Sequence, residues 1–392
     1  MTHLSGSSGT LTRGLALLMA VSVGIVVGNL YYIQPLLGEI ARALGSSEEK
    51  TGYAVPLCQA GLAFGTLFIL PLGDVRDRRN LILLSCVAAA FTLGWMATSR
   101  SVEAFLITNF LLGFVSIASH IQISYAAHLA HDDNRGRAVG VVVSGLLLGI
   151  FFARIISGIV GSIIGWRGML AVAVVLTLAL AVVLWKNLPR DAPRPHLPYS
   201  RLLSSLPRLW MTERTLRQSC VYGALTFALF NAFWATATFH LEGPVFELST
   251  RQIGLFGSVS LAGAVASIVA GHWTGRVPAQ RILLWALGLT LGAYGVLWGA
   301  GGSLVAVVIG IMLLDTGIQA THVANQDRVH ALDPAMRSRL HCIYMVAYFA
   351  GGALGGAIGT WAFARHGWAG VCGAGVGMAA LALGYRLTIG RK

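Results

Sequence analysis

One acidic and three polar residues lie in line along an apolar stretch of this sequence. In the run 303–327, Asp315 is followed by Gln319, His322 and Gln326, which lie four, seven and eleven residues further on. These spacings place all four side chains on one face of an α-helix. Burial favours the neutral form of a carboxylic acid, and an imidazole can relay protons near physiological pH. We therefore predict proton coupling at Asp315, with His322 as a relay.

A second set of residues has the same spacing in the run 103–129. Asn109, Ser116 and His120 lie on one helical face, and His120 is a further candidate relay. Arg154 lies alone in the apolar stretch "GIFFARIISGIVG". A charge inside a membrane costs several kcal/mol unless it is paired or faces water. We therefore predict that Arg154 pairs either with a buried residue, for which Asp315 is a candidate, or with an anionic group of a substrate.

The composition indicates that membrane helices must position these residues. The chain has 392 residues, of which 56% are hydrophobic and only 11% are charged. A helix needs about 20 apolar residues to cross a bilayer. Twelve runs meet this requirement, and we predict spans over 14–37, 52–72, 80–98, 103–129, 138–163, 168–186, 217–240, 252–273, 281–300, 303–327, 339–363 and 368–388.

The basic charge is distributed as in a membrane protein. With the amino terminus inside, 21 of the 28 Lys and Arg residues fall on the cytoplasmic side, six fall outside, and Arg154 lies within a span. This asymmetry predicts that both termini are cytoplasmic, and it argues against a nucleic-acid partner. The five cysteines are scattered without a C-x-x-C pair, so we expect no metal and no redox cofactor.

The chain divides into two halves at a segment rich in Pro, Arg and Ser. We predict an N-terminal six-helix half over 1–187, a cytoplasmic linker over 188–216 and a C-terminal six-helix half over 217–392. An offset of 202 residues places Asn231 on Asn29, His322 on His120 and Gly367 on Gly165. Because each half has an even number of spans, the two repeats run in parallel through the membrane.

Several motifs resemble the major facilitator superfamily. The segments "NLYYIQPLLGEIA", "PLGDVRDRR", "GRAVGVVVSGLLLGIFFARIISG" and "GWRGM" look like its drug and sugar efflux branch, whose members are described as proton antiporters. The resemblance implies an all-α integral membrane protein with 12 transmembrane helices in two parallel six-helix halves. It also implies a bacterial-type inner membrane, and efflux of a small organic molecule in exchange for protons.

The charged loop between the second and third spans carries the family's signature. Asp74, Arg78 and Arg79 match its acid and its closing basic pair, and Gly73 and Asp77 stand beside them. The resemblance implies that Asp74 forms a latch between the two halves on the inner side. An ordinary positive-inside loop is the competing interpretation, and it would explain the arginines but not the two acids.

The resemblance also implies that spans one, four, seven and ten line a central cavity. Polar anchors and aromatic faces there would suit an amphipathic organic ligand. An interhelical hydrogen bond is the competing interpretation for each polar residue. Besides Gln319, Gln326, Arg154 and the residues of span four, the predicted cavity residues are Asn29, Tyr32, Gln34, Asn231 and Trp234.

Other classes of function fit the sequence less well. There is no phosphate-binding G-x-x-x-x-G-K-[ST] loop, so direct use of ATP is not expected. An intramembrane enzyme would need paired carboxylates or a metal-binding pair of histidines, whereas Asp315 is the one acid near a midplane. We expect a monomer that handles a small molecule and protons. Uptake symport, facilitated diffusion and a non-transporting membrane sensor remain alternatives.

Overall fold

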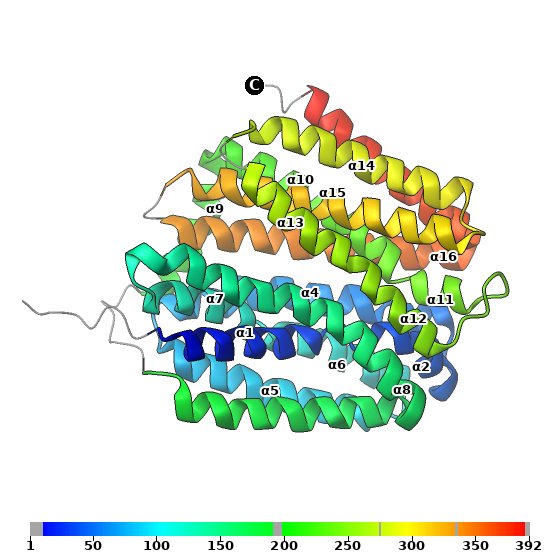
Figure 1. Ribbon diagram of the computed structural model, residues 1–392, viewed down its shortest axis with the longest axis horizontal. Coiled ribbons are helices and arrows are strands. Elements are labelled where there is room, and N and C mark those ends of the chain that lie inside the picture. Colours follow the sequence, from blue (N-terminus) through cyan, green and yellow to red (C-terminus); the bar gives the residue numbers. More distant parts are fainter. Residues whose placement is uncertain (1–10, 191–197, 274–275, 334–335, 389–392) are drawn as a thin grey trace, which may run out of the picture.

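The computed structural model describes residues 11–190, 198–273, 276–333 and 336–388. All regular elements in these ranges are helical, and none of the described residues forms a strand (Figure 1). This confirms the predicted all-α fold. Among the described residues, eight helical segments are long and apolar enough to cross a membrane, and α1 is a shorter apolar helix.

Two groups of helices follow one another along the chain. The first group consists of α1 (Arg13–Gly28), η1 (Gln34–Leu36), α2 (Leu37–Ala43), α3 (Glu48–Gly52), α4 (Ala54–Phe68), η2 (Leu70–Asp74), α5 (Arg78–Ala97), α6 (Val102–Val115), α7 (Ala118–Leu129), η3 (Asp132–Asn134) and α8 (Arg135–Asn187). The second group consists of α9 (Tyr199–Thr212), α10 (Arg214–Trp234), α11 (Ala237–Glu242), α12 (Thr250–Phe256), η4 (Gly257–Ser260), α13 (Leu261–Trp273), α14 (Ala279–Gly299), α15 (Leu304–His330) and α16 (Arg337–Thr388).

The two longest helices, α8 and α16, each contain two predicted spans. They bend at Gly165 and Gly367, whose φ angles are 72° and 57°. Glycine adopts this left-handed conformation without the steric cost that other residues meet. Both bends occur at positions related by the predicted offset of 202 residues, which is consistent with an internal repeat.

Several predicted spans are interrupted. The first is broken between α1 and η1, the fourth between α6 and α7, the seventh between α10 and α11, and the eighth at η4. Apolar runs predict the length of a span, but they do not reveal these breaks. The interruptions change which side chains share a face, and this matters for the predicted site.

The structure assigns a helix to part of the segment predicted as a linker. Within 188–216, residues 191–197 lie outside the described ranges, and α9 follows them. Its leucines at 202, 206 and 209 are buried, and the amphipathic spacing explains why this polar segment is helical. We call the end of the bundle that carries α9 and the start of α1 the linker end, and the end that carries α2 and α11 the far end (Figure 1).

Small residues bring two helix pairs into close contact. In the first half of the chain, Gly145 and Gly149 of α8 pack against the backbone of α1 at Ala20 and Gly24. In the second half, α16 packs in the same way on α10, through Gly351, Gly355 and Gly359 against Ala224, Ala228 and Ala232. Glycine and alanine allow helix backbones in membranes to approach closely. The repeated contact gives both halves the same internal framework.

We expect Gly355→Ala to destabilise the protein. An added methyl group would overlap the backbone of Ala228, and overpacking of this kind typically costs about 1–3 kcal/mol. Gly377→Ala in the same helix is the matched control, because nothing lies within 4 Å of the position that its added methyl group would take. The midpoint of thermal unfolding in detergent measures both. Equal midpoints for the two variants would contradict close packing at Gly355.

Contacts between the two groups of helices place the candidate site. α4 packs on α16, and α8 packs on α12 and η4. Arg154 lies in α8 at the second of these contacts, and Asp315 lies in α15, which also contacts η4. The charged residues predicted from the sequence therefore approach one another from separate helices.

Candidate functional site

Arg154 is a buried cation with several polar and aromatic neighbours. Its side chain is 1% exposed. Nε donates to Oε1 of Gln34 at 2.8 Å, and Nη1 donates to the hydroxyl of Ser260 at 3.2 Å. The guanidinium carbon lies 3.7 Å from the ring centre of Trp234 and 5.0 Å from that of Tyr31. Arginine is thus held by cation–π contacts as well as hydrogen bonds.

Asp315 lies close to Arg154 but forms no direct ion pair with it. The aspartate is 3% exposed, and both Ser260 and the indole of Trp234 approach its carboxyl group. Ser260, which also accepts from Arg154, therefore stands between the two charges. The two residues therefore pair indirectly, because η4 places the serine between them. The electrostatic interaction between the charges remains.

We call Gln34, Arg154, Trp234, Ser260 and Asp315 the central polar cluster. Three of its buried atoms have no hydrogen-bond partner, namely Nη2 of Arg154, Oδ1 of Asp315 and Nε1 of Trp234. Buried polar groups in proteins are nearly always satisfied. The indole of Trp234 already approaches the carboxyl group of Asp315, so Nη2 of Arg154 is the donor available for a ligand or for water.

The polar stripe of α15 continues from Asp315 towards the linker end. Gln319, His322 and Gln326 are all partly exposed, in contrast to the buried aspartate. Nε2 of Gln326 lies 3.0 Å from Nε2 of His322, and Nδ1 of His322 lies 3.0 Å from the hydroxyl of Tyr344. The amide nitrogen can only donate, so Nε2 accepts and Nδ1 carries the proton. A second proton can bind Nε2 of this imidazole once the amide of Gln326 turns over or moves away.

His120 lies on α7 and contacts α16. Its Nδ1 is 3.2 Å from the hydroxyl of Ser119, and its ring meets Phe349 edge-on at 5.7 Å. The ring of His322, on α15, lies 4.5 Å from the ring of Tyr348 between their centres, and Tyr348 belongs to α16 as Phe349 does. The two histidines are partly exposed and are not hydrogen-bonded to each other. Any relay between them would require an intervening water or ligand.

Three predicted cavity residues make structural hydrogen bonds instead of joining the central polar cluster. The amide of Asn29 donates to the hydroxyl of Thr177 in α8, at 3.0 Å. Asn109 and Asn231 each donate to the backbone carbonyl four residues earlier, at 2.7 Å and 3.0 Å. Only Asn29 therefore makes the interhelical hydrogen bond of the competing interpretation, while Asn109 and Asn231 bond within their own helices. The amide oxygen of each of the three is buried and has no hydrogen-bond partner.

Two other predicted cavity residues also lie outside the cluster. Tyr32 is buried, and its hydroxyl lies against Gly28. Ser116 is buried at the break between α6 and α7, and its hydroxyl makes no hydrogen bond. The neighbouring Tyr31, which the resemblance did not single out, is the tyrosine that faces Arg154.

Sequence reasoning missed several residues around the site. Ser260, Tyr31 and Phe230 contact or approach Arg154, while Tyr344 and Tyr348 contact His322. The two tyrosines of α16 lie four residues apart on one helical face, a spacing that was available in the sequence. A single serine in an apolar run gave no comparable signal.

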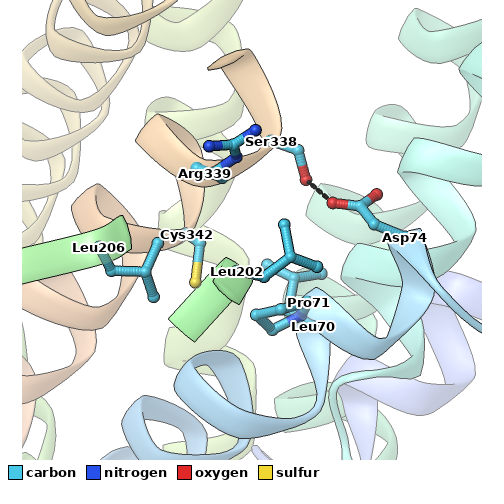
Figure 2. Close-up of a pocket in the computed structure, with 8 residues that line it drawn as sticks. All are labelled: Leu70, Pro71, Asp74, Leu202, Leu206, Ser338, Arg339 and Cys342. Atoms are coloured by element: carbon cyan, nitrogen blue, oxygen red, sulfur yellow. Dashed lines mark hydrogen bonds between the residues drawn. The ribbon is translucent and has the colours of Figure 1, made fainter. Parts of the chain in front are cut away.

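At the linker end, Asp74 connects the two halves of the chain. Its Oδ2 accepts from the hydroxyl of Ser338 in α16 at 2.7 Å, as Figure 2 shows. Its Oδ1 lies 3.6 Å from Nη2 of Arg78, whose Nε also donates to the carbonyl of Gly73. Three predicted latch residues thus form one network that reaches the second half.

The other two predicted latch residues stabilise the first half itself. The carboxylate of Asp77 accepts from the backbone N–H of Arg79 at 2.8 Å and caps α5. Arg79 donates to the carbonyl of Trp185 at the end of α8. An N-terminal cap of this kind contributes about 1 kcal/mol to helix stability. Asp77 and Arg79 therefore shape the loop that presents Asp74.

A small pocket lies where the latch meets α9. Leu202 and Leu206 of α9 face Pro71 of η2 and Cys342 of α16 (Figure 2). The thiol of Cys342 lies 3.4 Å from the carbonyl of Thr66, which belongs to the first half. The linker helix therefore packs against the latch region and both halves.

We expect Ser338→Ala to favour opening at the linker end. The hydrogen bond to Asp74 is partly exposed, so its loss should cost about 1 kcal/mol and shift the equilibrium about fivefold. Spin labels at positions 76 and 337 would report the separation of the halves. Ser204→Ala is the control, because Ser204 is exposed on α9 and its hydroxyl forms a hydrogen bond only within that helix. An unchanged distance distribution in Ser338→Ala would argue against a latch.

The far end is also bridged between the halves. Arg42 of α2 pairs with Glu242 of α11 at 3.2 Å, and Glu49 of α3 lies 3.8 Å from Arg365 of α16. Gly38 leaves the space that the carboxylate of Glu242 occupies. The pair between Glu49 and Arg365 is exposed, and exposed ion pairs contribute only about 0–1 kcal/mol each. The side chain of Glu242 is only 12% exposed, so its pair with Arg42 is more shielded from water.

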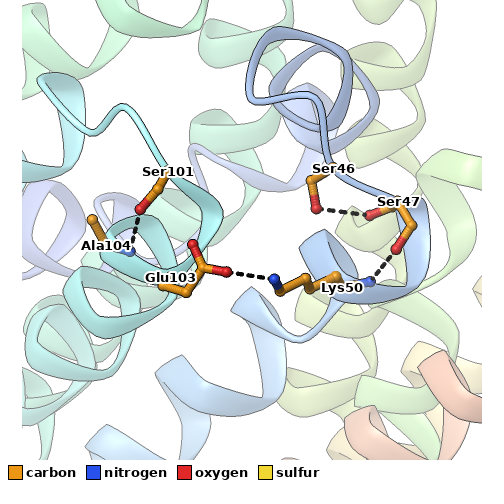
Figure 3. Close-up of polar contacts among 6 residues, drawn as sticks. All are labelled: Ser46, Ser47, Lys50, Ser101, Glu103 and Ala104. Atoms are coloured by element: carbon orange, nitrogen blue, oxygen red, sulfur yellow. Dashed lines mark hydrogen bonds and ion pairs between the residues drawn. The ribbon is translucent and has the colours of Figure 1, made fainter.

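Two further contacts organise the far end. The hydroxyl of Thr238 donates to the backbone carbonyl of Gln34 at 2.7 Å, so the segment that binds Arg154 also joins the halves. Figure 3 shows the ion pair between Lys50 of α3 and Glu103 of α6. This second pair lies within the first half and connects α3 to α6.

The chain matches known proteins along most of its length. The pattern of the Major Facilitator Superfamily matches residues 18–355. The chain is 38% identical over 369 residues to the "Uncharacterized transporter YgaY" of Escherichia coli O157:H7, with 94% of each chain covered. It is 23% identical over 350 residues to the "Probable sugar efflux transporter" of Pasteurella multocida, with 86% of this chain and 83% of the relative covered.

Solved structures show the same fold. The nucleoside transporter NupG superimposes with a TM-score of 0.78 at 12% identity, over 96% of this chain and 99% of the other. The expected architecture of twelve spans in this fold accounts for the bent helices α8 and α16, each of which contains two. From the matched family and the relatives, this chain belongs to the major facilitator superfamily of membrane transporters.

Proposed function

We propose that this protein exports a small organic molecule in exchange for protons. In this proposal the linker end faces the cytoplasm of a bacterial-type cell, as the 21 basic residues assigned to that side favour. The two halves rock about the central polar cluster, so that it opens to one side at a time. Similarity to a protein named as a sugar efflux transporter supports export.

The environment of Asp315 is the observation that carries the proposal. The carboxyl group is 3% exposed and makes no direct ion pair, while Arg154 interacts with it across Ser260. Proton binding would remove a buried negative charge, and proton release would restore the attraction to Arg154. Asp315 can therefore hold or release a proton according to the side to which the cluster opens.

A substrate can compete with the proton at this site. A cationic or hydrogen-bonding group that approaches the unpartnered Oδ1 atom of Asp315 favours the ionised form. The faces of Trp234 and Tyr31 provide apolar contacts beside it. Mutually exclusive binding of substrate and proton at one carboxylate is sufficient for exchange in opposite directions.

A second candidate is uptake of an anion together with a proton. The Nη2 atom of Arg154 is buried and has no partner, so it is available to a carboxylate on a ligand. Protonation of Asp315 would strengthen such binding, because it removes the competing negative charge. The anion and the proton would then bind together and move in the same direction.

Proteoliposomes with an imposed pH gradient distinguish these functions. Cationic drugs, sugars and amino-acid metabolites would be tested in both directions, with proton movement followed by a pH-sensitive dye. Exchange predicts that substrate added on one side drives protons to that side. Movement of substrate and protons together would establish symport instead, while transport without proton movement, or no transport at all, would reject the proposal.

A further inference from the structure

A second group of polar side chains lies at the linker end of the C-terminal helices, away from the central polar cluster. Its members come from four helices that converge there, α10, α14, α15 and α16. They are Gln218, Tyr222, Gln280, Arg328 and Arg386. We call this group the basic end cluster.

The hydrogen bonds of the basic end cluster leave donors unused. Nη2 of Arg328 donates to Oε1 of Gln218 at 2.8 Å, and its guanidinium lies 6.0 Å from the ring centre of Tyr222. Gln218 and Tyr222 are only 5% and 1% exposed. Nevertheless, Nε2 of Gln218 and the hydroxyl of Tyr222 make no hydrogen bond. Arg386 donates to Oε1 of Gln280 at 3.3 Å, and the hydrogen bond of Arg328 ends on the neutral amide of Gln218.

The two buried donors lack an acceptor. Within the part of the chain that the structure describes, Arg328 forms no ion pair, and a second cation, Arg386, acts on it electrostatically. Leaving a buried donor unsatisfied costs about 1–3 kcal/mol. The oxygens of one anion would satisfy both donors and would also attract the guanidinium group of Arg328 beside them. Phosphate fits because it offers several acceptors.

The depth of the cluster indicates where such an anion comes from. α10 and α14 begin beside it, at Arg214 and Ala279, while α15 and α16 end beside it. It therefore lies at the level where a membrane helix meets lipid headgroups. Trp273 and Trp285, on the neighbouring α13 and α14, are 44% and 53% exposed and contact each other. Exposed tryptophans are typical of the membrane interface.

We propose that the basic end cluster binds the phosphate headgroup of an anionic phospholipid from the linker-side leaflet. Arg328 neutralises the phosphate, while Gln218 and Tyr222 donate hydrogen bonds to its oxygens. The acyl chains lie along the exposed apolar surface of α14, where Leu284 and Trp285 face outwards. Basic pockets between membrane helices on the cytoplasmic side are suited to such headgroups.

Lipid titration of the purified protein in a neutral detergent tests this site. Phosphatidylglycerol is expected to raise the midpoint of thermal unfolding, and phosphatidylcholine is not. Arg328→Gln and Tyr222→Phe should each weaken the apparent affinity for phosphatidylglycerol about fivefold, by the loss of one charge or one donor. Arg281→Gln is the matched control, because this exposed arginine lies near the start of the same α14 and outside the cluster.

Several results would overturn the proposal. One is an equal effect of the two lipids, and another is unchanged affinity in both variants. A full effect of inorganic phosphate or glycerol phosphate alone would assign the site to a soluble anion in place of a lipid. If Arg328→Gln does not fold, Tyr222→Phe still decides, because it removes a single oxygen atom. None of these measurements depends on transport.

Discussion

Asp315→Asn is expected to abolish uphill transport driven by a pH gradient while the protein stays folded. Asparagine has nearly the same shape as aspartate but no proton to exchange, so a gradient can no longer be coupled to the central polar cluster. The change also leaves the buried Arg154 without its negative neighbour, so we expect the free energy of unfolding to fall by about 1–3 kcal/mol. Counterflow of labelled substrate without a gradient should persist.

The measurement is the initial rate of substrate movement in proteoliposomes, with and without an imposed pH gradient. Asp327→Asn is the control, since this residue is exposed on the same helix, α15. The control should keep the gradient-driven rate, whereas Asp315→Asn should fall to the rate seen without a gradient. Gradient-driven accumulation by Asp315→Asn would remove this residue from the coupling mechanism.

Arg154→Gln is expected to lower stability, and the additional change Asp315→Asn is expected to restore part of it. The single change leaves a buried carboxylate beside Ser260 without a neighbouring positive charge, which is unfavourable in a low-dielectric interior. The double variant removes both charges. We expect a coupling energy of about 1–3 kcal/mol between the two positions.

A double-mutant cycle on the free energy of unfolding in detergent measures this coupling. Arg251→Gln, an exposed arginine on α12, replaces Arg154→Gln in the control cycle and should show additive effects with Asp315→Asn. Additive effects in the Arg154 cycle as well would show that the two charges act independently. The indirect contact through Ser260 would then not contribute to stability.

The overall fold could be predicted from the sequence because membrane spans have a strong apolar signal. The glycines at 165 and 367 also mark the bends, since their repeated position is visible without a structure. The breaks inside spans could not be predicted in this way. The fourth span, for example, is broken between α6 and α7 but is about as apolar over its length as the continuous helix α15.

The candidate site shows both the reach and the limit of sequence patterns. Asp315 and Arg154 stand out because isolated charges are expensive in an apolar run, and they do approach each other. Ser260 does not stand out, although it bridges them, because its position depends on how η4 crosses α8. Asn29 had the right residue type and the right helix, but its side chain turns towards Thr177.

The position of Cys342 gives the unmodified chain a kinetic reporter. All five cysteines are buried, and this thiol lies between α16 and the carbonyl of Thr66, in the pocket that α9 covers. An alkylating reagent from the linker side can reach it only after these contacts separate. Its labelling rate therefore follows how often the linker end opens. Substrate or a pH change that shifts the population of states should change that rate, without an engineered probe.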